Sequence, residues 1–154
     1  QAQLLHHAPL MRFLAIDPGT MRLGLARGDE LGLASPLPAL VQSSATERWQ
    51  ALLEAVKLQK CTEIVVGYPL NMDDSVGPKA REAEQLAERL REATQLPVHL
   101  VDERLTSQAA EATLPKEKLR ELRSSGIIDS RAATVILQDY LDQRFPPELP
   151  EGDW

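Results

Sequence analysis

The sequence is short of the residues that build several common kinds of site. Its 154 residues include one cysteine, Cys61, which excludes an intrachain disulfide and a metal cluster held by cysteines. This cysteine usage is typical of a reducing compartment, so we expect a cytoplasmic protein. Cys61 lies between an amphipathic helix and a strand with no motif around it, and we therefore expect no nucleophilic role for its thiol.

Long apolar runs are also missing. The longest are too short to span a bilayer, and no segment has the basic, apolar and small-residue order of a signal peptide, so we expect no membrane partner. A net charge of −6 argues against a protein that coats nucleic acid by charge alone. It leaves room for an enzyme with a local basic patch beside an acidic metal site.

The length suggests one domain with a sizeable core. Residues 1–10 lack a clear period and precede a methionine, so we interpret them as an N-terminal extension. Residues 11–143 carry the apolar periodicity of a folded domain. Residues 144–154 form a proline-rich acidic tail.

The apolar pattern predicts a mixed sheet of five strands. The predicted strands cover residues 12–17, 22–28, 33–41, 63–67 and 98–102. The predicted helices cover residues 46–60, 79–94, 106–114 and 129–143, with Ser43 or Ser44 as the cap of the first. Three strands in a row, followed by helices that alternate with strands, indicate an α/β fold with helices on both faces of the sheet.

A single carboxylate ends the first strand. The apolar run 13–16 delivers Asp17 into the turn Pro18-Gly19, after which a second apolar strand begins. A carboxylate at this position is costly to bury without a cation or hydrogen-bond donors. Asp17 therefore either accepts hydrogen bonds from its own turn or serves a site, and the residue alone leaves both readings open.

Two further acids stand at the ends of predicted elements. Glu103 directly follows the strand 98–102, where it is either a functional acid or a solvated one paired with Arg104. Asp129 is an N-cap candidate for the last helix, yet it also heads the apolar stripe by which that helix packs on the sheet. Because the carboxyl ends of strands gather sites in such sheets, these acids are candidates for one common site.

Three carboxylates from two strand ends and a helix are suitable ligands for Mg²⁺ or Mn²⁺. Mg²⁺ binds few carboxylates and keeps water and substrate phosphate oxygens as its other ligands. Two such ions, about 3.5–4 Å apart, activate a water and stabilise the leaving oxygen in phosphodiester hydrolysis. His99 is predicted to lie mid-strand in the core, which favours a metal-activated water over a histidine base.

Four blocks of the sequence, in order, resemble the motifs of the YqgF/RuvX family. They are Asp17-Pro-Gly-Thr-Met-Arg-Leu-Gly-Leu-Ala26, Val66-Gly-Tyr-Pro-Leu-Asn-Met-Asp73, Val101-Asp-Glu-Arg-Leu-Thr106 and Ile128-Asp-Ser-Arg-Ala-Ala133. The family consists of bacterial proteins described as Holliday junction resolvases and pre-16S ribosomal RNA nucleases. The resemblance covers Met11 to about Leu141 and implies a ribonuclease-H-like fold.

The resemblance also implies roles for individual residues. The catalytic and metal-binding acids fall on Asp17, Glu103 and Asp129. By resemblance Arg104 and Thr106 lie near the substrate; the other readings are a surface charge and a helix cap. Apart from the resemblance, we expect the basic segment to contact phosphates, or else to be a solvated loop; it contains Lys116, Lys118, Arg120 and Arg123. The other expected substrate contacts are Thr20, Arg22, Asn71 and Arg131. In the loop before the second helix, Tyr68 replaces the family's leucine, and Asp74 and Val76 stand where glycine and glutamate are common.

These features predict a metal-dependent nuclease acting on branched DNA, on RNA or on both. The alternative is a non-cleaving factor that binds RNA or ribosomal precursors. A third reading, an ATPase, rests on the likeness of Asp17-x-Gly-Thr to the first phosphate loop of actin-like kinases; those proteins need a repeated domain that this chain lacks. Because a four-way junction has two-fold symmetry, a resolvase is expected to act as a homodimer.

Overall fold

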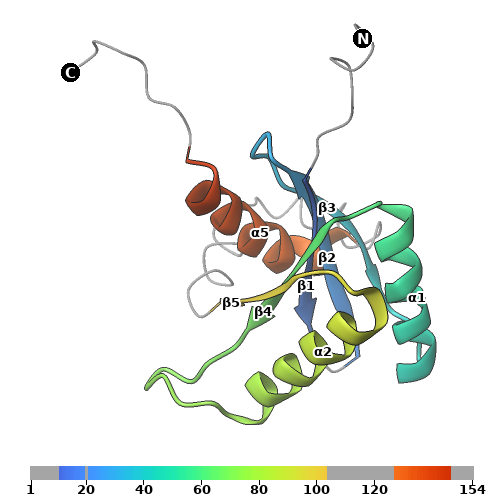
Figure 1. Cartoon of the computed structure of the whole chain (residues 1–154). Helices are drawn as coiled ribbons and strands as arrows, with labels where there is room; N and C mark the ends of the chain where they lie inside the picture. The colour runs from blue at the N-terminus through green and yellow to red at the C-terminus, as the bar shows by residue number, and fades with distance from the viewer. Residues whose placement is uncertain (1–10, 20, 104–126, 147–154) are drawn as a thin grey trace, which may run out of the picture.

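Five strands form one mixed sheet in the computed structural model, which describes residues 11–19, 21–103 and 127–146 (Figure 1). The strand order is β3-β2-β1-β4-β5. The strands are β1 (Arg12–Pro18), β2 (Leu23–Asp29), β3 (Ser35–Leu40), β4 (Glu63–Tyr68) and β5 (Val98–Asp102). Neighbours are antiparallel among β1, β2 and β3 and parallel along β1, β4 and β5, which confirms the predicted meander and crossovers.

Helices cover both faces of the sheet (Figure 1). α1 (Ala45–Leu58) and α2 (Pro78–Thr94) pack on one face, and α5 (Arg131–Arg144) packs on the other, directly after the 3₁₀ turn η2 (Ile127–Ser130). The helix predicted at 106–114 lies outside the described residues. None of the described helices combines the length and apolarity that a membrane crossing requires.

The alternation of side chains along β1 divides the core into two layers. Leu14 and Ile16 pack with α1 and α2, whereas Phe13 and Ala15 pack with α5. Since β1 lies between two other strands and both of its faces are covered, its apolar run is continuous. Asp17 continues the Phe13–Ala15 row, which places it on the face that carries α5.

The helix starts are only partly as predicted. Ser44 caps α1: its Oγ accepts a hydrogen bond from the Glu47 N–H at 3.0 Å and donates to the Glu47 carboxylate at 2.9 Å. The prediction of Asp129 as the cap of the last helix is wrong by one residue. Ser130 is the cap residue and Asp129 belongs to the preceding 3₁₀ turn, because its carboxylate is engaged by Arg22 instead.

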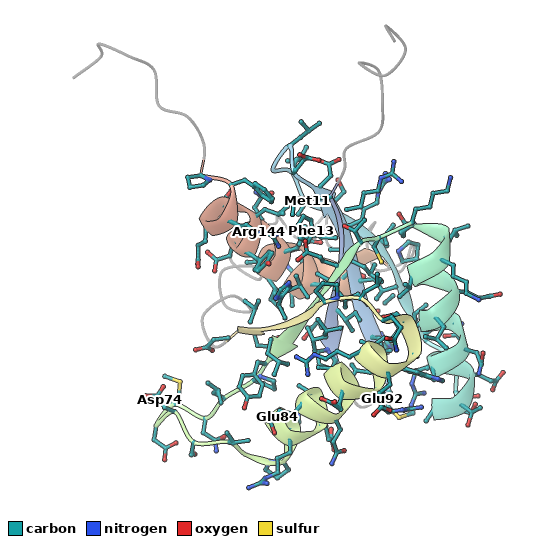
Figure 2. The ribbon with its side chains drawn as sticks, viewed as in Figure 1. Met11, Phe13, Asp74, Glu84, Glu92 and Arg144 are labelled. Carbon is teal, nitrogen blue, oxygen red and sulfur yellow. The ribbon has the colours of Figure 1, made fainter. Side chains whose placement is uncertain are left out.

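A buried charge ties the end of α5 to the sheet. Glu63, at the start of β4, accepts a hydrogen bond from Arg144 Nη1 at 2.6 Å, and His99 Nε2 lies 2.7 Å from the same oxygen. Arg144 and Phe13 lie side by side, with the guanidinium carbon 5.2 Å from the ring centroid (Figure 2). His99 was expected in the core and is instead a partly exposed member of this cluster. Burial opposes ionisation of Glu63, but the hydrogen bonds from Arg144 and His99 outweigh it and lower its pKa.

Glu63→Gln should lower the free energy of unfolding at pH 7 by about 1–2 kcal/mol, because it removes a charge-assisted hydrogen bond from a buried site. A carboxyl group whose pKa is lowered by folding stabilises the folded state at pH values above its ordinary pKa of 4.5. This contribution is lost as the pH falls through the folded-state pKa. The difference between wild type and variant should therefore shrink below pH 4.5 in denaturant titrations. The matched control is Glu88→Gln, which removes an exposed partner of Arg91 and should change stability little. A gap between wild type and Glu63→Gln that stays constant with pH contradicts this account.

Candidate active site

Asp17 stands between two residues that have no side chain. Gly24 of β2 is its register partner on one side. On the other side Gly67 follows Val66, the partner of Ile16, so Gly67 lies level with Asp17 in β4. The row Gly24–Asp17–Gly67 crosses the sheet on the face that carries α5. An isolated glycine inside a strand often marks the close approach of another group, and both of these glycines do so.

The carboxyl group of Glu103 fills the space above Gly67. A Cβ atom added at Gly67 would overlap Glu103 Oε2 and would lie 3.0 Å from Ile136 Cδ1 of α5. The Glu103 N–H donates to the Tyr68 carbonyl at 3.4 Å, which holds the residue beside the end of β4. From this position the Glu103 carboxyl reaches Asp17 and forms a hydrogen bond with it.

The backbone of Asp129 fills the space above Gly24. A Cβ atom added at Gly24 would lie 2.5 Å from the Asp129 carbonyl oxygen and 3.3 Å from Ser130 Cα. The Asp129 carboxylate accepts a hydrogen bond from Arg22 Nη1 at 2.8 Å. The Arg22 side chain is 60% exposed, and exposed ion pairs of this kind are weak, so either partner can exchange it for another.

The two contacting carboxyl groups share a proton near neutral pH. Burial is the largest cause that raises the pKa of Glu103, the negative charge of Asp17 adds to it, and together they bring that pKa to about 8. Burial also raises the pKa of Asp17, while the hydrogen bond from protonated Glu103 works in the opposite direction. The pair therefore retains a proton at pH 7 and loses it only as the pH passes about 8.

This donor set fits a hard divalent cation. Asp17 and Glu103 bring two carboxyl groups together in a partly buried site, and carboxylate oxygens are the ligands that Mg²⁺ and Mn²⁺ prefer. Within the described ranges no three His, Cys, Asp or Glu residues surround a common point, since Asp129 faces Arg22. The structure thus brings Asp17 and Glu103 into contact and places the Asp129 backbone beside them.

The remaining residues predicted at the site divide into three groups. Asn71 organises the loop between β4 and α2. Its side-chain Nδ2 donates to Ser75 Oγ at 2.9 Å, and its backbone carbonyl accepts a hydrogen bond from the Asp74 N–H at 2.9 Å. Asp74 lies at the outer tip of the loop (Figure 2). Arg131 opens α5, two residues after Asp129. Outside the described residues lie Thr20, Arg104, Thr106, Lys116, Lys118, Arg120 and Arg123.

The metal-free protein should lose stability as the pH rises. A carboxyl whose folded-state pKa is raised contributes stability below its ordinary value of 4.5, and Glu103 loses this contribution as the pH passes about 8. The melting temperature should fall by several degrees over this range, and Mn²⁺ should restore it at the upper end. Glu103→Gln should flatten the profile, whereas Glu92→Gln, at an exposed position of α2, should keep the wild-type slope. Equal slopes in all three proteins would refute the shared-proton account.

A family model and close relatives match almost the whole chain. The model described as "RuvX: Holliday junction resolvase" matches residues 11–143. A protein of Opitutus terrae named "Putative pre-16S rRNA nuclease" is 63% identical over 141 residues, which are 91% of this chain and 97% of that protein. A protein of the same name from an Anaeromyxobacter species is 43% identical over 137 residues, covering 88% of this chain and all of the relative.

Solved structures share the fold at low sequence identity. Thermus thermophilus RuvC, in complex with a Holliday junction substrate, aligns with a TM-score of 0.54 at 19% identity over 88% of this chain and 96% of RuvC. The yeast mitochondrial Holliday junction resolvase aligns with a TM-score of 0.51 at 13% identity over 86% of this chain and 78% of its own. These likenesses confirm the predicted ribonuclease-H-like fold. Together with the family model and the relatives, they lead to one conclusion: the chain belongs to the RuvX family.

Proposed function

We propose that this protein is a divalent-metal-dependent nuclease that hydrolyses phosphodiester bonds in structured nucleic acid. The observation that carries the proposal is the hydrogen-bonded pair of Asp17 and Glu103, held at the ends of β1 and β5 with the backbone of Asp129 packed beside it. Precursor 16S ribosomal RNA is the first substrate to test, because the relatives at 63% and 43% identity are named for it. Junction DNA is the second, because the family description names it.

Asp17, Glu103 and Asp129 are the residues that hold Mg²⁺ or Mn²⁺ in this proposal. When bound, the ion supplies positive charge that makes a water more acidic and stabilises the leaving oxygen. Glu103 must first give up the proton that its pKa of about 8 retains, so metal binding releases a proton. His99, the histidine of the described part, contacts Glu63 instead, which leaves the proton chemistry to carboxyl groups and water.

Arg22 is the described cation best placed to bind a substrate phosphate. It lies at the rim of the site, and its bond to Asp129 is exposed enough to be exchanged. In our proposal it releases Asp129 toward the other two acids and turns to the phosphate. Arg131 and Asn71 complete the described substrate contacts. From outside the described residues the proposal adds Thr20, Arg104, Thr106, Lys116, Lys118, Arg120 and Arg123.

One observation favours the alternative of a non-cleaving RNA-binding factor. The carboxylate of Asp129 faces Arg22 and stands apart from the Asp17–Glu103 pair. In a binder this ion pair is a permanent structural contact and the acid pair has no chemical role. Cleavage assays separate the two functions, because only the nuclease depends on the charge of Asp17.

Asp17→Asn should reduce cleavage of precursor 16S RNA by at least about 1,000-fold in Mg²⁺ or Mn²⁺, because it removes a ligand charge but keeps the size of the side chain. RNA affinity and the fold should be retained. The matched control is Asp139→Asn, which removes the charge of an exposed acid of α5 that bonds to Gln143. This control should retain most of the activity. Inactivity of the wild type on both RNA and junction DNA would support the binder, and equal cleavage by wild type and Asp17→Asn would remove Asp17 from the site.

The basic segment should supply phosphate contacts that depend on salt. Replacing its four cations by glutamine should weaken RNA binding on every sequence and flatten the plot of log affinity against log salt by roughly 0.7–0.9 per lost contact. The four are Lys116, Lys118, Arg120 and Arg123. The measurement is RNA affinity by fluorescence anisotropy at several salt concentrations.

A variant with equal charge loss elsewhere provides the control for this measurement. It replaces four exposed cations by glutamine, namely Arg27, Lys57, Lys60 and Arg81. This variant should keep the wild-type slope, because it leaves the four cations of the basic segment in place. The same slope in all three proteins would exclude the phosphate role of the basic segment.

A further inference from the structure

Ser130, at the start of α5, forms hydrogen bonds with the backbone of two strands of the sheet. Ser130 is fully buried, and its Oγ donates a hydrogen bond to the Leu37 carbonyl at 2.5 Å and accepts one from the Leu25 N–H at 3.0 Å. Leu25 and Leu37 are register partners in β2 and β3, next to the irregularity between Leu23 and Leu25. The hydroxyl therefore bridges the two strands where they would otherwise bond to each other directly.

Ser130 does not use this hydroxyl for its own helix. It occupies the N-cap position of α5, where a serine usually accepts a hydrogen bond from the first turn, yet it makes no such side-chain bond. In the first turn of the helix, Thr134 Oγ1 donates a hydrogen bond to the Ser130 carbonyl at 2.8 Å. The placement of the Ser130 hydroxyl thus serves the contact with the sheet rather than the start of the helix.

The contact fixes the residue that precedes it. Asp129 is one bond away along the backbone, and its carbonyl oxygen rests over Gly24, the register partner of Asp17. Ser130 is held by hydrogen bonds to two strands, and the Asp129 carbonyl is packed directly on Gly24. The backbone of Asp129 is therefore fixed in position. Its carboxylate can then move only by rotation of its own side chain, between Arg22 and the acid pair.

We infer that Ser130 is a positioning residue that holds Asp129 at the distance from Asp17 and Glu103 at which its carboxylate joins them on a divalent cation. The inference rests on the proposed metal site and adds a role that motif reasoning does not supply. It also gives Gly24 a matching role, since a side chain there would displace the same backbone. Groups that orient metal ligands in this way are commonly worth about 10-fold to 100-fold in metal affinity.

The test measures Mn²⁺ binding to the full chain by titration calorimetry. Ser130→Ala, which removes the bridging oxygen, should raise the Mn²⁺ dissociation constant by about 10-fold or more. In RNA cleavage, kcat should recover as Mn²⁺ is raised, which a general loss of structure would not allow. The matched control is Thr134→Val, which removes a hydroxyl from the same helix and keeps its volume. Its bond is internal to the helix, so Mn²⁺ affinity should stay within about twofold of wild type.

A second variant covers the case in which Ser130→Ala fails to fold. Gly24→Ala keeps the serine and both of its partners but places a Cβ atom 2.5 Å from the Asp129 carbonyl, so it should weaken Mn²⁺ binding as well. Wild-type Mn²⁺ affinity in either folded variant overturns the inference and leaves the nuclease proposal standing. A third outcome is a wild type that binds Mn²⁺ but cleaves no substrate, together with variants that bind Mn²⁺ more weakly. This result supports the inference and overturns the nuclease proposal. A wild type that binds no Mn²⁺ overturns both.

Discussion

The two-residue period of a β-strand decides which parts of this molecule can reach Asp17. Asp17 lies on the same face as Phe13 and Ala15, so α1 and α2, on the opposite face, cannot contact it directly. Only the chain that covers the α5 face and the ends of neighbouring strands can approach it. Every group that does so needs space above β2 or β4, and the two glycines in the row of Asp17 provide that space.

α5 is held to the sheet at both ends by buried polar contacts of different kinds. At its start the Ser130 hydroxyl bridges β2 and β3, and at its end Arg144 bonds to Glu63 at the start of β4. Apolar packing between these points, through residues such as Ile136 and Leu137, is strong but does not fix direction. Hydrogen bonds are directional, so the two polar contacts set how far the helix can slide or turn.

The layers and the sequence of strands and helices along the chain could be predicted because they follow from local patterns. Apolar runs, turn residues and helical stripes gave all five strands and the three longer described helices, with ends within a few residues. Asp17 and Glu103 could be predicted as neighbours because both follow buried strands. Ser130 could not, because its partners Leu25 and Leu37 lie about a hundred residues away in the chain and no local pattern marks a serine that enters a sheet. The buried Glu63 escaped prediction for the same reason.

β4 makes a contact at each end that depends on which face of the sheet the residue lies on. Glu63 opens the strand and receives Arg144, and four residues later Gly67 leaves room for the Glu103 carboxyl on the same face. Because side chains alternate, adding or removing one residue between them would turn one of the two toward α1 and α2. The length of β4 is therefore constrained more tightly than that of the loop that follows it. The four-residue spacing between Glu63 and Gly67 must be kept for both contacts to form on one face.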